Sequence, residues 1–337
     1  MLLKPYTREA AKVKIAVVGA GAIGSYLGAC LYRGGAEVTL IARGPHLEAM
    51  QKNGIKVCSP QGDFDASPMA TSDFSAISDC EVVFITLKAY SLVELMPRVA
   101  KNLSNDAVVV SGQNGIPWWY FESHGGQFDG LCLESVDPDG IVQRSLGFGR
   151  TVGSVIYPAT EILEPGVIRH IEGTRLTIGE PDRTVSQRCE RISEIFAAGG
   201  LKCRVDINLR NQVWLKLLGN ASLNPVSALT RASLGKLGEH PEIVNIVRSM
   251  MEEISEVGKA LGVKLPIGID RRLERGFAVG DHKTSMLQDI EARKPLEHAC
   301  MSGAVVELAQ ILGIPVPYLE TVNALTVMLD RGPIPPN

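Results

Sequence analysis

The sequence predicts an α/β protein in which an N-terminal Rossmann-type doubly wound sheet is followed by a C-terminal all-α domain. Up to residue 207, apolar strand-like runs alternate with amphipathic helical segments, as a parallel sheet with crossover helices requires. A glycine-rich turn joins the first strand to the first helix. From about residue 208 onward the hydrophobic periodicity is helical. We therefore expect two domains, a dinucleotide-binding domain over 1–207 and a helical substrate domain over 208–337.

Composition excludes several classes of protein. The 337 residues are 45% hydrophobic and 21% charged, which is typical of a globular chain. The net charge of −3 and the lack of a basic cluster argue against nucleic-acid binding, and no apolar run has the length of a membrane span. Residues 1–12 lack the apolar core of a signal peptide, so we expect a short leader and a cytoplasmic protein. Seven irregularly spaced cysteines predict reduced thiols, with neither disulfide nor metal.

The first strand, Ile15–Val18, is a continuous apolar run and ends in a G-x-G-x-x-G turn. Gly19 permits the tight turn, Gly21 lets the backbone approach a pyrophosphate, and Gly24 lets the helix pack close to the strand. The helix that follows offers free N–H groups and a partial positive charge to the phosphates. The alternative is a glycine-rich turn without a ligand. The predicted cofactor turn comprises Gly19, Ala20, Gly21, Ala22, Ile23 and Gly24.

The end of the second strand, Glu37–Arg43, indicates which dinucleotide binds. Sites for NAD usually place an acidic residue there to accept a hydrogen bond from the ribose 2′-hydroxyl. This chain has Ala42, Arg43 and Gly44 instead. A guanidinium can pair with a 2′-phosphate, so Arg43 favours NADPH over NADH, the alternative being an exposed loop arginine.

Two further strands place polar residues at the same edge of the sheet. Cys80–Leu87 ends at Lys88, and Ala107–Ser111 is followed by Asn114. Ligands of doubly wound sheets bind outside the carboxyl ends of the strands, so Lys88 could reach a phosphate or the nicotinamide, and Asn114 the ribose or the substrate. A surface role is the alternative for each. The other predicted elements of this domain are a hairpin over Ile55–Cys58 and Phe64–Ser67, helices over Ser91–Leu103 and Ser186–Ala198, and a strand over Lys202–Val205.

The segment between the last predicted parallel strand and the helical domain is less regular. Ile116–Arg150 is irregular and contains Trp118 and Trp119, which we expect to pack at a domain seam rather than to bind a ligand. Thr151–Glu180 contains three β-rich pieces with a Pro-Gly turn, which predict a meander that completes the sheet.

The helical domain carries the candidate catalytic residues. Lys216, Asn220 and Asn224 are spaced i, i+4 and i+8, so they share one face of a helix that we expect to end at Pro225. A lysine ammonium can pair with the carboxylate of a 2-oxo acid and protonate its carbonyl oxygen, while amides orient the other oxygens. A plain polar stripe is the alternative. The remaining helices are predicted over Glu242–Leu261, Ser285–Arg293 and Glu297–Leu312; Ser285 fits a capping box, and Glu297 could simply complement a helix dipole.

Taken together, these motifs resemble the ketopantoate reductase (2-dehydropantoate 2-reductase) family from about residue 13 to about 315. The resemblance is carried by the glycine turn, Val38–Arg43, Leu87–Ala89, Gln113–Gly115, Trp214–Pro225 and Thr284–Asp289 with Glu297 beyond. It implies reduction of ketopantoate to pantoate, in pantothenate biosynthesis, by an enzyme that is commonly a homodimer.

The resemblance also implies a role for each site residue. The glycine turn, Arg43 and Lys88 would hold NADPH, and Asn114 would lie where cofactor meets substrate. Lys216 would be the catalytic acid. Glu297 would line the junction of cofactor and substrate, where it can orient Lys216. The residues implied to bind substrate are Asn114, Lys216, Asn220, Asn224 and Ser285.

Three departures from the family pattern fall on the substrate side. Leu234 and His282 occupy positions where better-known members carry asparagines, and the Ile116–Arg150 insertion differs from the short form. A site that loses hydrogen-bonding groups can change its substrate, so a bulkier or more apolar 2-oxo acid is a second hypothesis. A sensor that binds NADPH without turning it over is a third, which the retained Lys216 and Glu297 oppose.

Overall fold

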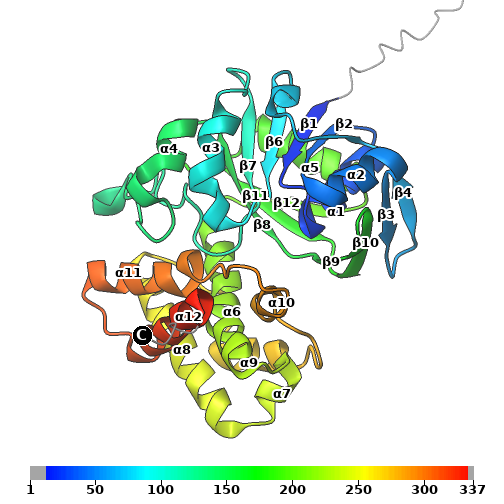
Figure 1. The fold of residues 1–337 in the computed structure, drawn as a ribbon. Coiled ribbons are helices and arrows are strands. Elements are labelled where there is room, and N and C mark those ends of the chain that lie inside the picture. Colours follow the sequence, from blue (N-terminus) through cyan, green and yellow to red (C-terminus); the bar gives the residue numbers. More distant parts are fainter. Residues whose placement is uncertain (1–12, 333–337) are drawn as a thin grey trace, which may run out of the picture.

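The computed structural model describes residues 13–332, so the predicted leader over residues 1–12 lies outside the described part of the chain. A sheet domain is stacked on a helical region formed by the C-terminal part of the chain (Figure 1). The predicted fold class is confirmed. No helix within residues 13–332 combines the length and the apolar character needed to cross a bilayer.

The main sheet has eight strands in the order β12-β11-β8-β7-β6-β1-β2-β5. All its neighbouring pairs are parallel except β8 and β11. The chain order reverses between β1 and β6, and crevices at such points are the usual ligand sites of open α/β sheets. The strands are β1 (Lys14–Val18), β2 (Glu37–Ile41), β5 (Met69–Thr71), β6 (Val82–Ile85), β7 (Val108–Ser111), β8 (Thr151–Ile156), β11 (Arg175–Gly179) and β12 (Lys202–Val205).

Both faces of this sheet are covered. Ala16 and Val18 of β1 belong to one apolar core, whereas Ile15 and Val17 belong to the other, because successive strand side chains point to opposite faces. α1 (Ala22–Arg33) and α5 (Gln187–Ala198) contribute to the second core, and α3 (Leu92–Ala100) and α4 (Ile141–Leu146) to the first. α2 (Gly44–Asn53) follows β2.

A second, four-stranded sheet has the order β4-β3-β10-β9. The hairpin of β3 (Ile55–Cys58) and β4 (Phe64–Ala66) agrees with the prediction. The expectation that 151–180 completes the main sheet is right for β8 and β11 but wrong for β9 (Ala159–Glu164) and β10 (Val167–Glu172). No residue of β9 is fully buried, so β9 lacks the apolar faces of an interior strand, and β10 instead pairs in parallel with β3.

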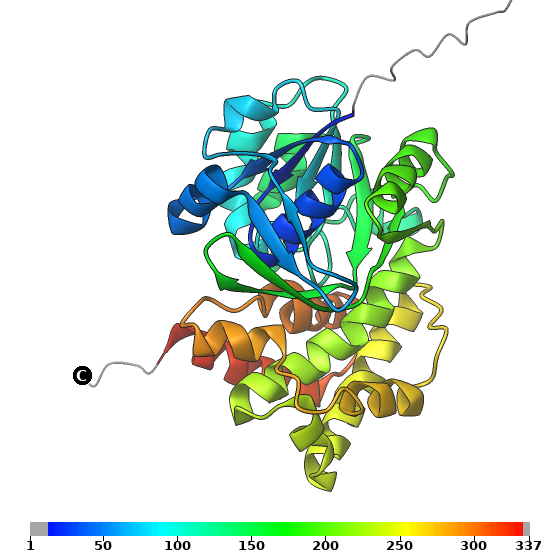
Figure 2. The same cartoon turned by 90° about the vertical axis from the view of Figure 1, so that its right-hand side faces the viewer.

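The helical region is built around α6, which passes directly beneath the sheet domain (yellow-green in Figure 2). The prediction that Pro225 ends this helix is wrong, since α6 runs through Pro225 to Thr230. Every residue from Leu223 to Ala228 is buried, so tertiary packing holds the helix together where proline removes one hydrogen bond. The helices are α6 (Leu209–Thr230), α7 (Leu234–Gly238), α8 (Pro241–Ala260), α9 (Ile269–Phe277), α10 (Ser285–Glu291), α11 (Ala304–Leu312) and α12 (Pro317–Arg331).

The aromatic segment after β7 packs between the two parts of the molecule, as predicted. Trp119 is fully buried and donates to Ser111 Oγ at 2.6 Å, on the sheet side. Trp214 of α6 donates to the hydroxyl of Tyr120 at 2.6 Å. This segment therefore fixes α6 against the sheet.

Candidate active site

The glycine turn after β1 has the geometry of a phosphate-binding turn. Gly19 has φ +101°, and a Cβ there would lie 2.8 Å from the backbone nitrogen of Leu87. A Cβ on Gly24 would overlap the carbonyl oxygen of Gly19 and lie 2.6 Å from Thr86 Oγ1. A Cβ on Gly21 would meet nothing within 4 Å. Two glycines are therefore required by packing, whereas the third leaves open space beside the start of α1 where a pyrophosphate could approach.

Arg43 is the N-cap of α2 and is separated from the end of β2 by Ala42. Its side chain is exposed, and it forms no ion pair with a carboxylate among residues 13–332. Such a guanidinium is free to bind a phosphate group. The structure thus places Arg43 at the strand end where the sequence predicted it, two residues after Ile41.

Lys88 joins the sheet domain to the helical region. Its Nζ lies 2.8 Å from Asp289 Oδ2 and 2.8 Å from Glu297 Oε2, and the N–H of Ala89 donates to Glu297 Oε1 at 3.1 Å. Burial alone would lower the pKa of Lys88, but the two carboxylates outweigh it and raise this pKa above its usual value. Lys88 therefore remains an ammonium. Asp289 belongs to a motif that carried the family resemblance, but sequence reasoning gave it no role of its own.

Lys216 points from α6 toward the sheet. Its Nζ donates to Asn114 Oδ1 at 2.7 Å and to the carbonyl oxygen of Ile156 at 2.5 Å, and it lies 6.0 Å from the ring centroid of Tyr157. Burial lowers the pKa of Lys216 to about 8, and the negative charge of Glu297 offsets only part of this shift. A lysine with this pKa can give up a proton near neutral pH, as a general acid must.

The structure brings Lys216 and Asn114 together but does not bond Glu297 to Lys216. Glu297 is buried and uses both carboxylate oxygens on Lys88 and on the N–H of Ala89. The orientation of the Lys216 ammonium comes instead from Asn114 and from the last residue of β8, Ile156. Glu297 acts on Lys216 through its charge.

The amides predicted to bind substrate lie on the Lys216 helix. Asn220 is half-buried and Asn224 is buried, and neither amide has a hydrogen-bond partner within the described residues. Ser285 is the exposed first residue of α10. The capping box predicted for Ser285 is wrong, because Thr284 is the N-cap and accepts from the N–H of Leu287 at 3.2 Å. The Ser285 hydroxyl is therefore not used to cap this helix.

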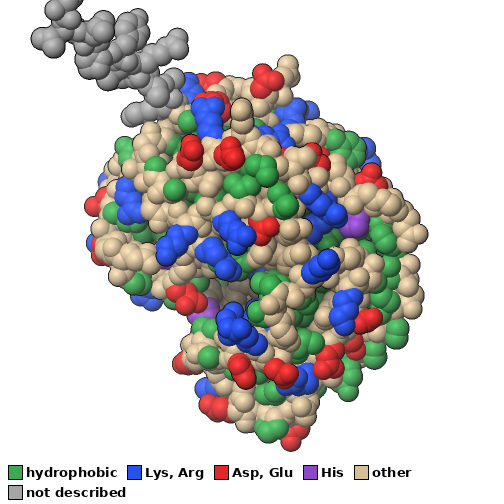
Figure 3. Space-filling model, turned by 180° about the vertical axis from the view of Figure 1, so that it is seen from behind, with side chains coloured by type: hydrophobic (Ala, Val, Ile, Leu, Met, Phe, Trp, Pro, Cys, Tyr) green, Lys and Arg blue, Asp and Glu red, His purple; other side chains and the backbone are tan. Residues whose placement is uncertain are grey.

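A small pocket lies beside Lys216. Both polar amide atoms of Gln113, which lines it, are buried and have no hydrogen-bond partner among the residues that the structure describes. Buried polar atoms are normally paired, so a bound molecule is the natural partner for this amide. Gln113 belongs to a motif that carried the family resemblance, but the sequence predicted no role for it. Seen from behind, the surface is hollowed between the sheet domain and the helical region, with Lys and Arg side chains around the hollow (Figure 3). The pocket is lined by Gln113, Asn114, Gly115, Pro117, Ser154, Val155, Val213, Lys216 and Leu217.

Two family models match the chain. The model described as ketopantoate reductase PanE/ApbA matches residues 15–119, and the one described as its C-terminal part matches residues 208–329. Among curated proteins, the 2-dehydropantoate 2-reductase of Mesorhizobium japonicum is 40% identical over 323 residues, which cover 95% of this chain and 99% of that protein.

Solved structures show the same fold. A PanE/ApbA family ketopantoate reductase from Ralstonia eutropha has a TM-score of 0.82 and 30% identity, covering 95% of this chain and 99% of the other. A D-mandelate dehydrogenase solved with NADH and anilino(oxo)acetate has a TM-score of 0.80 at 18% identity, covering 95% of this chain and 99% of the other. At 18% identity, the similarity to the D-mandelate dehydrogenase shows a shared fold only.

Proposed function

Because the chain belongs to the ketopantoate reductase PanE/ApbA family, we propose that it reduces 2-dehydropantoate (ketopantoate) to pantoate with NADPH, as a cytoplasmic enzyme of pantothenate biosynthesis. The observation that carries the proposal is the Lys216 ammonium, which Asn114 and the Ile156 carbonyl hold at the seam between the sheet domain and α6. In this proposal, residues 1–207 form the cofactor-binding domain and residues 208–337 form the substrate domain.

In this proposal Lys216 is the proton donor. Bound NADPH supplies the hydride that reaches the carbonyl carbon. As negative charge develops on the carbonyl oxygen, the Lys216 ammonium donates its proton there and becomes a neutral amine, which solvent then reprotonates. Asn114 holds the ammonium in place. The amides of Asn220 and Asn224, which have no partner among residues 13–332, orient the substrate together with the Ser285 hydroxyl.

The residues on the cofactor side fit NADPH. The open side of Gly21 leaves room for the pyrophosphate. Arg43, which has no carboxylate partner in the described part of the chain, offers its guanidinium to the 2′-phosphate. Lys88 lies at the same sheet edge, where it would contact the cofactor, and its ion pairs with Asp289 and Glu297 hold the two parts of the molecule together. NADPH is therefore expected to be preferred over NADH.

A different, more apolar 2-oxo acid is the second candidate substrate, and one observation favours it. Leu234 and His282, the two single-residue departures from the family pattern, are neighbours, since the N–H of Leu234 donates to the carbonyl oxygen of His282 at 3.0 Å. Both positions lack the amide side chain of the better-known members, and Leu234 puts an apolar side chain in its place. Discrimination between substrates that differ by a hydroxyl depends on such groups.

The test is a panel of 2-oxo acids, ketopantoate included, assayed with NADPH and with NADH by the loss of reduced-nicotinamide absorbance. Ketopantoate with NADPH should give the highest kcat/KM. Lys216→Ala should lower kcat by about 10²- to 10⁴-fold while NADPH affinity stays near wild type, because it removes the general acid. Lys259→Ala, an exposed lysine of α8, is the matched control and should change neither quantity.

The assay results that would contradict the proposal each point to a different conclusion. A higher kcat/KM for an apolar 2-oxo acid would replace ketopantoate with the second candidate. Tight NADPH binding without turnover of any 2-oxo acid would indicate a sensor. Loss of NADPH binding in Lys216→Ala would remove Lys216 from the substrate side.

A further inference from the structure

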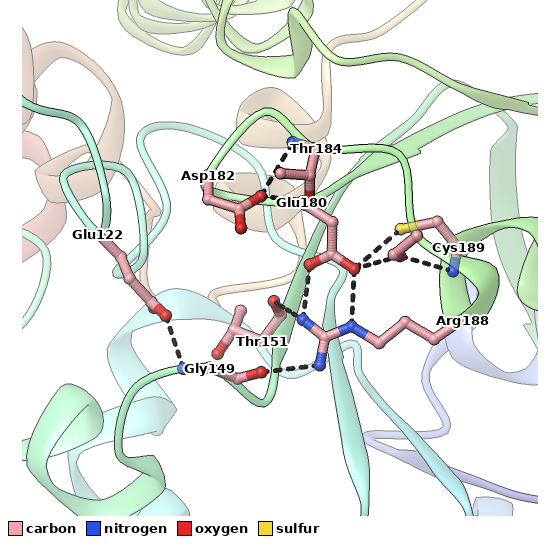
Figure 4. Close-up of polar contacts among 9 residues, drawn as sticks. Glu122, Gly149, Thr151, Glu180, Asp182, Thr184, Arg188 and Cys189 are labelled. Atoms are coloured by element: carbon pink, nitrogen blue, oxygen red, sulfur yellow. Dashed lines mark hydrogen bonds and ion pairs between the residues drawn. The ribbon is translucent and has the colours of Figure 1, made fainter.

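Two partly or fully buried arginines show how this fold satisfies a guanidinium. Arg188 pairs with Glu180 through two hydrogen bonds, of 2.7 and 2.6 Å, and also donates to the carbonyl oxygen of Gly149 at 2.7 Å (Figure 4). Arg210 is buried and donates to three backbone carbonyl oxygens at 2.7–2.8 Å. Both cations are therefore satisfied by protein acceptors, as buried charges usually are.

Arg272 of α9 differs from these two. It is half-buried, yet within residues 13–332 its guanidinium has neither a carboxylate nor a carbonyl partner. Burial lowers the pKa of Arg272, and the nearby Tyr157 only partly offsets this. A guanidinium that loses water without gaining an acceptor is unfavourable in the free protein, and an anionic ligand would relieve it.

Gly219 of α6 makes room for this guanidinium. A Cβ on Gly219 would overlap Arg272 Nη2 and lie 2.6 Å from its Cζ. Gly219 is three residues after Lys216, so the guanidinium lies over the same stretch of α6 that presents the candidate acid. Glycine is a poor residue for a helix interior, and the close approach of Arg272 accounts for its use here.

The same region gathers more positive charge than the protein neutralises. Arg175 lies 3.9 Å from the ring centroid of Tyr157, and Lys216 lies 6.0 Å from it. Arg272 is within electrostatic reach of the same ring. None of these three cations forms an ion pair with a carboxylate in the described part of the chain. Asp206, the acid that also acts on Tyr157, accepts instead from the N–H of Asn208 and the amide of Gln212.

We propose that Arg272, seated over Gly219, binds the carboxylate of the 2-oxo acid substrate and so selects for a charged substrate. This inference rests on the proposed reductase function and names one of its specificity-determining residues. A guanidinium matches a carboxylate bidentately. Because Arg272 and Lys216 both lie near Tyr157, a carboxylate on Arg272 would direct the adjacent carbonyl group toward the proton donor. Lys216 then does not have to bind the carboxylate and can donate its proton to the carbonyl oxygen.

The experiment compares a 2-oxo acid with its primary amide, which keeps the ketone but loses the charge. Arg272→Gln should lower kcat/KM for the acid by roughly 10- to 100-fold and leave the amide within about twofold, so that the preference for the acid collapses. Gly219→Ala should act in the same direction, because its methyl group displaces the guanidinium. Arg271→Gln, an exposed neighbour on α9, is the matched control and should change neither substrate. NADPH affinity should not change in any of these variants.

The possible outcomes separate this inference from the function on which it rests. Wild-type protein that reduces no 2-oxo acid would overturn the reductase function itself. Turnover of the acid with its preference over the amide intact in Arg272→Gln would overturn the role of Arg272 alone. An equal loss for acid and amide would make Arg272 structural, and weaker NADPH binding would assign it to the cofactor.

Discussion

Two lysines at the domain seam carry opposite pKa shifts because their partners differ. Lys88 has two carboxylates at 2.8 Å, and these outweigh its burial. Within residues 13–332, Lys216 bonds only to neutral oxygens, from Asn114 and Ile156, so the effect of burial on its pKa prevails. One lysine is therefore fixed as a structural cation, whereas the other is ready to lose its proton. Such divergence within one site is how a fold assigns acid–base roles.

The pH dependence of reduction follows from the pKa of Lys216, which burial lowers to about 8. The donor must be protonated, so the single-turnover rate should be level below pH 8 and fall roughly tenfold per pH unit above it. The rate should be measured by stopped flow at saturating NADPH and ketopantoate. An unshifted lysine would instead keep the rate level to about pH 10.

A control distinguishes the fall in rate above pH 8, the alkaline limb of the pH profile, from the titration of other groups. Lys216→Ala should lose the limb near pH 8 together with most of the rate, because no other group would then supply the proton at this position. A limb that persists unchanged in Lys216→Ala would assign the titration, and the proton donor, to another residue.

In the β1–α1 turn, we expect alanine substitution of one glycine to weaken cofactor binding and of another to lower the stability of the protein. A Cβ on Gly21 meets nothing within 4 Å, so Gly21→Ala should fold normally but bind NADPH at least several-fold more weakly, because the methyl occupies the approach of the pyrophosphate. A Cβ on Gly24 overlaps the backbone of Gly19, so Gly24→Ala should destabilise the protein by about 1–3 kcal/mol. Denaturant unfolding and NADPH fluorescence titration measure the two effects.

A result at either position could contradict the assignment of Gly21 to cofactor binding and of Gly24 to stability. Normal NADPH affinity in Gly21→Ala would place the pyrophosphate elsewhere. An unchanged free energy of unfolding in Gly24→Ala would mean that α1 can move away from the turn without loss. The two substitutions are matched in size and lie within one turn of each other.

The sequence predicts elements well where a local pattern determines them. The apolar runs before Gly19 and Lys88 specify buried parallel strands, and period-four spacing specifies the face of α6 that carries Lys216. It fails where distant partners decide the structure. β10 leaves the main sheet because β3 offers an edge, and α6 continues past Pro225 because the residues around it are buried.

The same distinction applies to the candidate site. Lys216 and Asn114 belong to recognisable motifs, and the structure joins them over 102 positions of sequence. The partners that keep Lys88 charged, and the residues around Arg272, come from distant parts of the sequence through tertiary contacts. Asp289 lies 201 positions from Lys88, and Gly219 has no spacing signal that would connect it with Arg272. Pair contacts of this kind cannot be read from local periodicity.

At the scale of the whole molecule, one apolar core crosses the boundary between the sheet domain and the helical region. Its buried members include Val83 and Val109 of the sheet, Trp119 of the connecting segment, and Leu217 and Ile254 of the helices. The Lys88 ion pairs and the Lys216 hydrogen bonds cross the same boundary. Separating the two parts would expose this core and leave buried charges without partners.

Thermal unfolding should therefore be a single cooperative transition, although chains of this size often unfold domain by domain. In differential scanning calorimetry the calorimetric enthalpy should equal the van't Hoff enthalpy. NADPH at about 100 times its Kd should stabilise the folded protein by about 2.7 kcal/mol and raise Tm without splitting the peak. Two resolved peaks, with NADPH moving only the one assigned to residues 13–207, would show that the parts fold independently. The shared core would then be too weak to couple cofactor binding to the helical region that carries Lys216.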